Sequence, residues 1–209
     1  MRPSILPDPS IYRGLAVRPW QMATWHSDHP IFAELVRIVA PRLVIEVGTW
    51  LGGSALVMAE ALKVQGTGTL LCIDTWLGSV EFYLDPTPAR DLNLRHGHPD
   101  VYEQFISNVV IRGHDTRIQP WPMPSRMAAQ LLQARDVTAD LIYLDGSHEP
   151  RDVTDDLCAY WPRVRPGGVL FGDDYHPAWP SVTTAVNTFA RTMNLRLTIR
   201  EPFWMLEGR

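Results

Sequence analysis

The sequence predicts an α/β fold, with a doubly wound, mostly parallel sheet and helices on both faces. Two observations support this prediction. Short apolar runs typical of buried strands alternate along the chain with longer runs of helical period, which is the order of a parallel sheet. Several apolar runs also end in a glycine turn or an acidic residue, as expected where strand ends form a ligand-binding edge.

The first half of the chain supplies two helices and two strands before a long connection. A helix is expected over about 28–41, where apolar residues recur three and four positions apart. LVIEV (43–47) and TLLCID (69–74) predict buried strands, and GGSALVMAEALKVQ (52–65) predicts a helix between them. Residues 75–98 show no clear period and carry several aromatic side chains, so we expect a lid or substrate loop there.

The second half continues the alternation of helices and strands. It predicts, in order, a helix at 99–112, a strand at 116–120, a helix at 125–135, a strand at 140–145, a helix that buries Val153 and Leu157, a turn at RPGG (165–168), a strand at 169–174 and a helix at 181–193. The last residues are typical of two strands around Pro202, which would add an antiparallel strand near one edge of the sheet.

The composition is that of one globular domain. The chain has 209 residues and a net charge of -4, and we expect a single domain over 1–209 in which prolines make 1–27 irregular.

The absence of a basic stripe argues against nucleic acid as a partner, and no window reaches the ~18 apolar residues of a membrane span. The first residues lack the apolar core of a signal peptide. Cys72 and Cys158 lie in apolar stretches and are expected to be buried thiols, which favours a cytoplasmic protein.

The turn after the first strand, EVGTWLGGS, favours binding of a nucleotide. Gly48 permits a tight turn and the close approach of a ligand. Asp74 ends the second strand, where an acid satisfies ribose hydroxyls in related sheets. A glycine turn required only by packing is the competing interpretation.

Three acidic residues follow two of the most apolar strands. Asp145 comes after LIYL, and Asp173 and Asp174 come after VLFG. Unpaired carboxylates are costly at a core edge, but the carboxyl ends of parallel strands face a ligand. Three converging acids would repel one another, and a hard divalent cation with oxygen ligands would relieve that repulsion. The alternative is that Asp173 or Asp174 only caps the next turn.

Over roughly residues 20–209 the sequence resembles the class I S-adenosylmethionine-dependent methyltransferases. The resemblance rests on VIEVGTWLGGSA, on Asp74 at the end of the second strand, on LIYLDGSHE and on RPGGVLFGDD. It implies a Rossmann-like methyltransferase sheet whose glycine turn lies against the methionine part of the cofactor, with Asp74 on the ribose and Ser125 by the adenine. The residues implied to bind S-adenosylmethionine are Glu46, Gly48, Thr49, Trp50, Ser54, Asp74 and Ser125.

Within that superfamily the chain is most similar to metal-dependent small-molecule O-methyltransferases, both the catechol type and the sugar-specific enzymes of macrolide and aminocoumarin pathways. These share an acid after strand four and an acid followed by Asp or Asn after strand five, a pattern that Asp145, Asp173 and Asp174 match. The resemblance implies that these three residues hold a divalent metal, with Mg²⁺ as our choice. His148 stands where the catechol type has a lysine base, so it is the implied general base, and Asp145 and His176 are the competing candidates.

The predicted function is therefore metal-dependent O-methylation of a small diol-like acceptor, such as a sugar, a glycoside or a catechol-type natural product. An aromatic wall for this acceptor is expected from Trp76, Phe82, Tyr83 and Trp121. Three alternatives stay open: a metal-independent N- or O-methyltransferase, a cofactor-binding protein without catalysis, and a nicotinamide-dependent oxidoreductase, although the last lacks the G-x-G-x-x-G motif. A homo-oligomer is compatible with the resemblance, since relatives are often dimers or larger.

Overall fold

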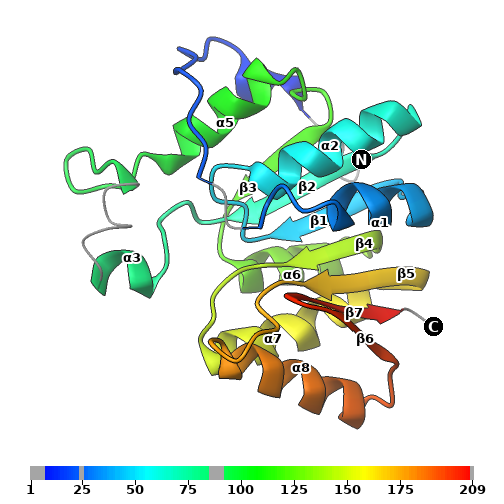
Figure 1. Ribbon diagram of the computed structural model, residues 1–209. Coiled ribbons are helices and arrows are strands. Elements are labelled where there is room, and N and C mark those ends of the chain that lie inside the picture. Colours follow the sequence, from blue (N-terminus) through cyan, green and yellow to red (C-terminus); the bar gives the residue numbers. More distant parts are fainter. Residues whose placement is uncertain (1–7, 24–25, 85–91, 208–209) are drawn as a thin grey trace.

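One sheet of seven strands organises the computed structural model, which describes residues 8–23, 26–84 and 92–207. The strands are β1 (Leu43–Val47), β2 (Thr69–Asp74), β3 (Ile118–Pro122), β4 (Ala139–Leu144), β5 (Val164–Gly172), β6 (Leu197–Arg200) and β7 (Phe203–Glu207). Their order is β3-β2-β1-β4-β5-β7-β6, and β7 is antiparallel to both of its neighbours while β1 to β5 are parallel. The predicted sheet, with its antiparallel strand near one edge, is confirmed (Figure 1).

Helices cover both faces of this sheet. They are the short 3-10 helices η1 (Pro9–Tyr12) and η3 (Trp161–Arg163), and α1 (Ile31–Val39), α2 (Gly53–Gln65), α3 (Val80–Leu84), α5 (Val101–Ile111), α6 (Ser125–Ala134), α7 (Pro150–Tyr160) and α8 (Pro180–Thr192). Helices α1, α2 and α5 pack on one face and α6, α7 and α8 on the other, whereas α3 stands away from both layers (Figure 1). Neighbouring strand residues alternate between the two cores, as Val44 and Ile45 do.

The order of the strands reverses where β1 and β4 meet. From this pair the chain continues to β2 and β3 on one side and to β5 on the other, and sheets of this kind bind ligands at the carboxyl ends of such a pair. The backbone N–H of Asp145 donates to the carbonyl of Val47 over 2.8 Å and joins the two strand ends. Gly48 has a φ of 83°, and a Cβ atom there would lie 1.8 Å from the Asp145 carbonyl oxygen. Packing alone therefore requires glycine at position 48.

One expectation about backbone structure was wrong. RPGG does not form a turn ahead of β5 but lies within it, where the pairing jumps from Ala139–Val164 to Leu141–Val169 and the intervening residues bulge out of the ladder. The segment at 75–98 contains α3, whose five residues are too few to show a period, and its role as a lid or substrate loop stays a prediction; residues 85–91 of that segment lie outside the described residues. The other predicted elements differ from the structure by a few residues at their ends.

Three expectations about side chains were also wrong. Trp76 and Trp121 are 1% and 8% exposed and belong to the two cores, so neither forms part of an aromatic wall. Cys158 is exposed on α7, whereas Cys72 is buried as expected. Burial on a helix depends on which face meets the sheet, and a single apolar neighbour does not define that face.

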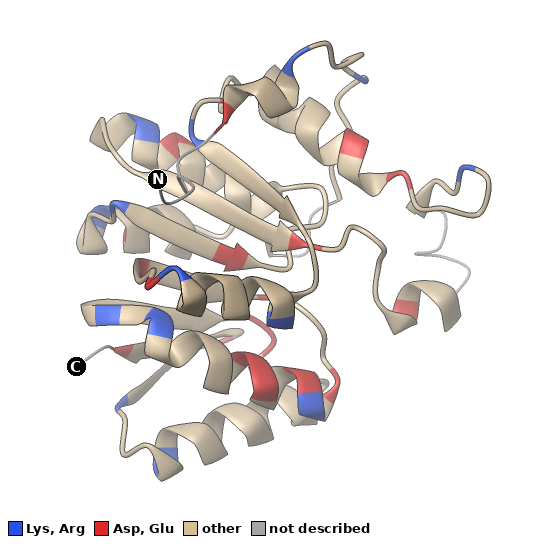
Figure 2. Ribbon diagram, turned by 180° about the vertical axis from the view of Figure 1, so that it is seen from behind, with Lys and Arg blue, Asp and Glu red and all other residues tan. Residues whose placement is uncertain are grey.

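The charged residues are distributed unevenly over the molecule. Many Asp and Glu residues lie toward the carboxyl ends of the parallel strands, whereas Lys and Arg are more frequent toward the amino ends (Figure 2). None of the helices in the described ranges is long and apolar enough to cross a membrane.

We expect Gly48→Ala to destabilise the fold far more than Gly66→Ala. Both glycines have a φ of 83°, so both changes carry the ~1–2 kcal/mol cost of a left-handed alanine. Only the Cβ atom at position 48 meets backbone, because nothing lies within 4 Å of the one at position 66. Urea denaturation of the two variants measures the difference, and equal losses would show that β1 and β4 can separate at little cost.

Candidate active site

The carboxylate of Asp74 holds the turn between β1 and α2. Its Oδ2 accepts hydrogen bonds from the backbone N–H groups of Thr49 and Trp50, each over 2.8 Å, and its Oδ1 accepts one from Trp76 over 2.7 Å. Trp50 has a φ of 50°, and these bonds offset the cost of that conformation. These bonds use three of the four acceptor positions of the carboxylate, so one position, on Oδ1, remains for a further donor.

Glu46 supports the same turn from inside the protein. It is fully buried at the end of β1 and accepts hydrogen bonds from Ser54, from Thr49 over 3.1 Å, and from the thiol of Cys72 over 3.5 Å. Burial outweighs these bonds and raises the pKa of Glu46 to about 7. Glu46 therefore loses its proton close to neutral pH.

Helix α2 starts without a side-chain cap, which leaves its first N–H groups available. Its N-cap residue is Gly52, and within the described residues no side chain makes a capping hydrogen bond there. Free N–H groups and the helix dipole favour an anionic group at such an end. The arrangement suits the carboxylate of an amino-acid moiety lying along the turn.

Ser125 lies at the first position of α6 and is held by α7. Its hydroxyl donates to a carboxylate oxygen of Asp156, and its carbonyl accepts a hydrogen bond from Tyr160 over 2.9 Å. Burial raises the pKa of Asp156 to about 6. The sequence did not single out Asp156, because one acid among three on the same helix carries no signal of burial.

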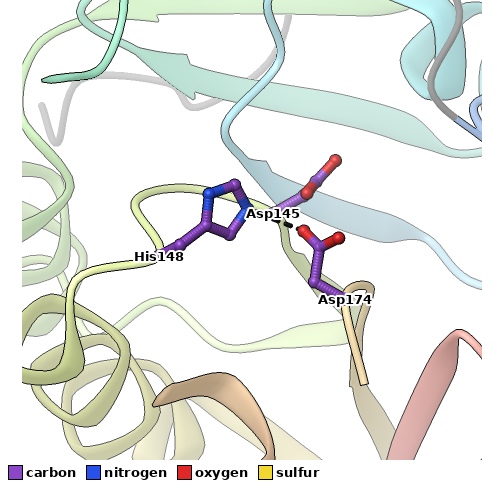
Figure 3. Close-up of side chains that lie close together, drawn as sticks. All are labelled: Asp145, His148 and Asp174. Carbon is purple, nitrogen blue, oxygen red and sulfur yellow. Dashed lines mark hydrogen bonds and ion pairs between the residues drawn. The ribbon is translucent and has the colours of Figure 1, made fainter. Parts of the chain in front are cut away.

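Asp145, His148 and Asp174 come together beside the turn between β1 and α2. One potential ligand atom from each lies within 4.8 Å of the others, and Figure 3 shows the three side chains converging from the loops after β4 and β5. The His148 Nε2 is 2.6 Å from Asp174 Oδ2, and Tyr143 donates to Asp145 Oδ2 over 2.9 Å. Burial, followed by the charges of Asp173 and Asp174, raises the pKa of Asp145 well above its usual range.

Asp173 occupies a neighbouring position outside that group of three. Its Oδ1 accepts a hydrogen bond from the backbone N–H of Asp174 over 2.6 Å, and its Oδ2 is 3.4 Å from His26 Nδ1. The carboxylate is buried, and burial together with the adjacent charge of Asp174 raises its pKa to about 6. His26, from the N-terminal segment, was not predicted to reach the site.

The histidines differ in their surroundings. Burial by itself would lower the pKa of His148, but the hydrogen bond to Asp174 and the charges of Asp174, Asp145 and Glu81 raise it. His176, the third candidate base, has a side chain that is 54% exposed and lies 3.8 Å from Glu201. Of the two candidate histidines, His148 is therefore the one that the structure brings to the acids.

Comparisons with known proteins identify the family and the fold. Residues 45–175 match the family described as methyltransferase domain. An O-methyltransferase from Bacillus cereus, solved in complex with SAH, is 13% identical, with a TM-score of 0.61 over 96% of this chain and 88% of that one. The O-methyltransferase NovP is 20% identical, with a TM-score of 0.64 over 87% and 79%. A TDP-rhamnose 3'-O-methyltransferase of calicheamicin biosynthesis is 17% identical, with a TM-score of 0.61 over 85% and 77%.

Fold and family match together define a methyltransferase with a Rossmann-like sheet. The chain belongs to the methyltransferase-domain family, and it is a class I S-adenosylmethionine-dependent methyltransferase. No curated protein is significantly similar to it in sequence.

We expect the stability of the cofactor-free protein to fall as pH rises from about 4.5 through 7, in part because of Glu46. The pKa of Glu46 is about 7 in the folded state and the ordinary 4.5 in the unfolded state. Between these two pH values the folded state binds more protons than the unfolded state, so the free energy of unfolding decreases as pH rises. Each unit of pKa difference corresponds to at most ~1.4 kcal/mol. Chemical denaturation at a series of pH values should show a flatter profile for Glu46→Gln than for the wild type. Parallel profiles would mean that Glu46 stays ionised in the fold.

Proposed function

We propose that this protein transfers the methyl group of S-adenosylmethionine to a hydroxyl of a small diol-like acceptor, with help from a divalent metal. The observation that carries the proposal is the convergence of Asp145, His148 and Asp174 beside the β1–α2 turn. Carboxylates at that place repel one another without a cation, and a histidine among them can take a proton from a hydroxyl. A protein that only binds the cofactor would need neither feature.

The cofactor is proposed to lie along the turn between β1 and α2. Its ribose hydroxyls would bind Asp74, and its methionine carboxylate would face the uncapped start of α2. Thr49, Trp50 and Ser54 line that end of the turn, and Gly48 allows the chain to pass close to the end of β4. Ser125, held by α7, is the proposed neighbour of the adenine.

The residues at the carboxyl ends of β4 and β5 fit a divalent metal. Burial, together with the charges of neighbouring carboxylates, raises the pKa of Asp145 and of Asp173, so a cation beside them would favour their ionised forms. A hard ion such as Mg²⁺ prefers oxygen ligands, so Asp145, Asp173 and Asp174 would hold it. When bound, the ion would lower the pKa of an acceptor hydroxyl and fix its direction.

The protein's own residues would then position and deprotonate the acceptor. His148 Nε2 lies at the edge of the acid group, where it can receive the hydroxyl proton, and Asp145 is the alternative base. Methyl transfer is an in-line displacement, so its rate depends on alignment of the oxygen with the methyl group and the sulfur.

The proposed acceptor class is a sugar, glycoside or catechol. Phe82 on α3 packs against Trp50 with ring centroids 4.4 Å apart, and Trp179 stacks on His148 at 4.1 Å. Flat apolar surfaces of this kind suit the face of a sugar ring or an arene. The similarity to NovP and to a TDP-rhamnose methyltransferase supports a sugar.

Asp145→Asn is expected to lower methyl transfer by at least ~100-fold and to remove the calorimetric heat of Mg²⁺ binding. The change keeps the shape of the side chain but takes away a charge that the metal requires, and a metal supplies several kcal/mol to such a transition state. Binding of S-adenosylmethionine should be largely retained.

The matched control for this test is Asp155→Asn. Asp155 is an exposed acid on α7 that lies 3.9 Å from Arg151, so its loss should change neither binding nor rate. Full activity of the wild type in a chelator, after removal of metal, would rule out the metal-dependent reaction and favour a metal-independent methyltransferase.

Asp74→Ala is expected to weaken S-adenosylhomocysteine binding by ~1–3 kcal/mol and to abolish discrimination against its 2'-deoxy analogue. The first effect follows from the loss of a charged hydrogen-bond acceptor, but it also includes loosening of the turn. The second effect is specific to the ribose contact. Calorimetry with both ligands separates the two, and unchanged discrimination would place the ribose elsewhere.

A further inference from the structure

Ser125, at the start of α6, belongs to a hydrogen-bonded group that also includes two side chains of α7. The Ser125 hydroxyl donates to Oδ1 of Asp156. Tyr160, one turn further along α7, donates its own hydroxyl proton to the Ser125 carbonyl over 2.9 Å. The Tyr160 oxygen is 3.4 Å from Ser125 Oγ, beyond the usual length of an O–H···O hydrogen bond. The proton of the serine hydroxyl is therefore committed to Asp156.

This arrangement fixes what the Ser125 hydroxyl can offer to a ligand. A hydroxyl has one proton and two lone pairs, whereas an ionised carboxylate can only accept hydrogen bonds. Because the proton of Ser125 points at Asp156, the Oγ atom can act toward a third group only as an acceptor. Ser125 is half-buried, so this acceptor remains within reach of a ligand.

Ser125 follows a strand end that lies beside the proposed ribose site. The last residue of β3 is paired with Asp74 at the end of β2. The N–H of Met123 also donates to the carbonyl of Asp74 over 2.9 Å, and Ser125 is two residues further on. Asp156 reaches the loop after β4, since a Cβ atom on Gly146 would lie 3.5 Å from its Oδ2. A base attached to a ribose at Asp74 would therefore lie near Ser125 and Asp156.

We propose that Asp156 is a positioning residue for cofactor specificity, which holds the Ser125 hydroxyl as an acceptor for the 6-amino group of adenine. This inference rests on the proposed function, in particular on the placement of S-adenosylmethionine along the β1–α2 turn. The free ring nitrogens of adenine are acceptors, and the 6-amino group is the hydrogen-bond donor of the base. A hydroxyl that can only accept therefore matches adenine at that group, whereas it opposes the oxygen of a 6-oxo purine.

The test compares the affinities for two ligands that differ at position 6 of the purine. S-adenosylhomocysteine and its 6-oxo analogue, S-inosylhomocysteine, are titrated in a calorimeter at pH 8, which needs no acceptor substrate. Burial raises the pKa of Asp156 to about 6, so its carboxylate is ionised at that pH. The wild type should bind the adenine ligand ~10–100-fold more tightly, as expected when one hydrogen bond is replaced by two unpaired polar atoms.

Three variants should lower this preference. Ser125→Ala removes the acceptor, and Asp156→Ala lets the serine hydroxyl donate as well as accept, so the ratio of the two affinities should fall to ~1–3 in both. Asp156→Asn keeps the shape of the side chain, so it serves where Asp156→Ala does not fold. Its amide can accept from the hydroxyl or donate to it, so the ratio should fall to an intermediate value.

Two changes on α7 are the controls. Tyr160→Phe removes the hydrogen bond to the Ser125 carbonyl but leaves the serine hydroxyl with Asp156, so the ratio should stay even if both affinities fall. Asp155→Ala removes the neighbouring acid, which is exposed and lies 3.9 Å from Arg151, and should change neither affinity. A group that only fastens α6 to α7 would behave differently, because its loss would weaken both ligands alike.

Three outcomes would decide against the proposal or against its basis. Equal affinity of the wild type for the two ligands, or a ratio unchanged in the Asp156 variants, would overturn the specificity role and leave the methyltransferase assignment intact. Loss of the Mg²⁺ heat in Asp156→Ala with an unchanged ratio would also overturn it, because Asp156, which lines a cavity with Asp145 and Asp174, would then serve the acids. Failure of the wild type to bind S-adenosylhomocysteine would instead remove the proposed function itself.

Discussion

Uncompensated negative charge at the carboxyl ends of β4 and β5 is the constraint on which the site depends. The two strands are parallel neighbours, with Leu144 paired to Gly172, so the acids that follow them must meet. Asp174 reaches this position with a φ of 61°, a left-handed conformation that costs ~1–2 kcal/mol for a residue other than glycine. Its N–H donates to the Asp173 carboxylate, which stabilises that conformation. Neither the backbone strain at Asp174 nor the repulsion between the acids stabilises the fold. Their presence therefore argues that these acids bind a ligand.

The two acids at the turn proposed for the cofactor are held by hydrogen bonds. The carboxylate of Asp74 accepts three of them from backbone N–H groups of Thr49, Trp50 and Trp76. Glu46 is buried deeper and relies on hydroxyl and thiol donors, which do not offset the cost of its burial. The two sides are joined where Gly48 packs against Asp145, so the position of the turn and the position of the first acid are set by one contact.

The sequence predicted the sheet and most of the site because those features have local signatures. Strand period, glycine turns and acids after apolar runs are visible within a few residues, and the parallel topology brings their ends to one edge. The contact of Glu81 with His148 and that of His26 with Asp173 had no such signature, because they join segments far apart in the chain. Burial of Trp76 was missed for a similar reason: its neighbours Phe105 and Tyr102 lie on α5, beyond the connection that suggested a loop.

The balance of charge favours a divalent ion over a monovalent one. Four carboxylates lie in this part of the molecule: Asp145, Asp173, Asp174 and Glu81. Among the described residues, their ion pairs are with two imidazoles, those of His26 and His148, and with no lysine or arginine. Even if both imidazoles were protonated, two negative charges would remain, which is the charge that one divalent cation carries. Protonation of Asp145 is the competing way to reduce the excess, and burial together with the charges of Asp173 and Asp174 raises its pKa in that direction. A bound divalent cation and a proton on Asp145 therefore exclude each other, so metal binding should release a proton and strengthen as pH rises.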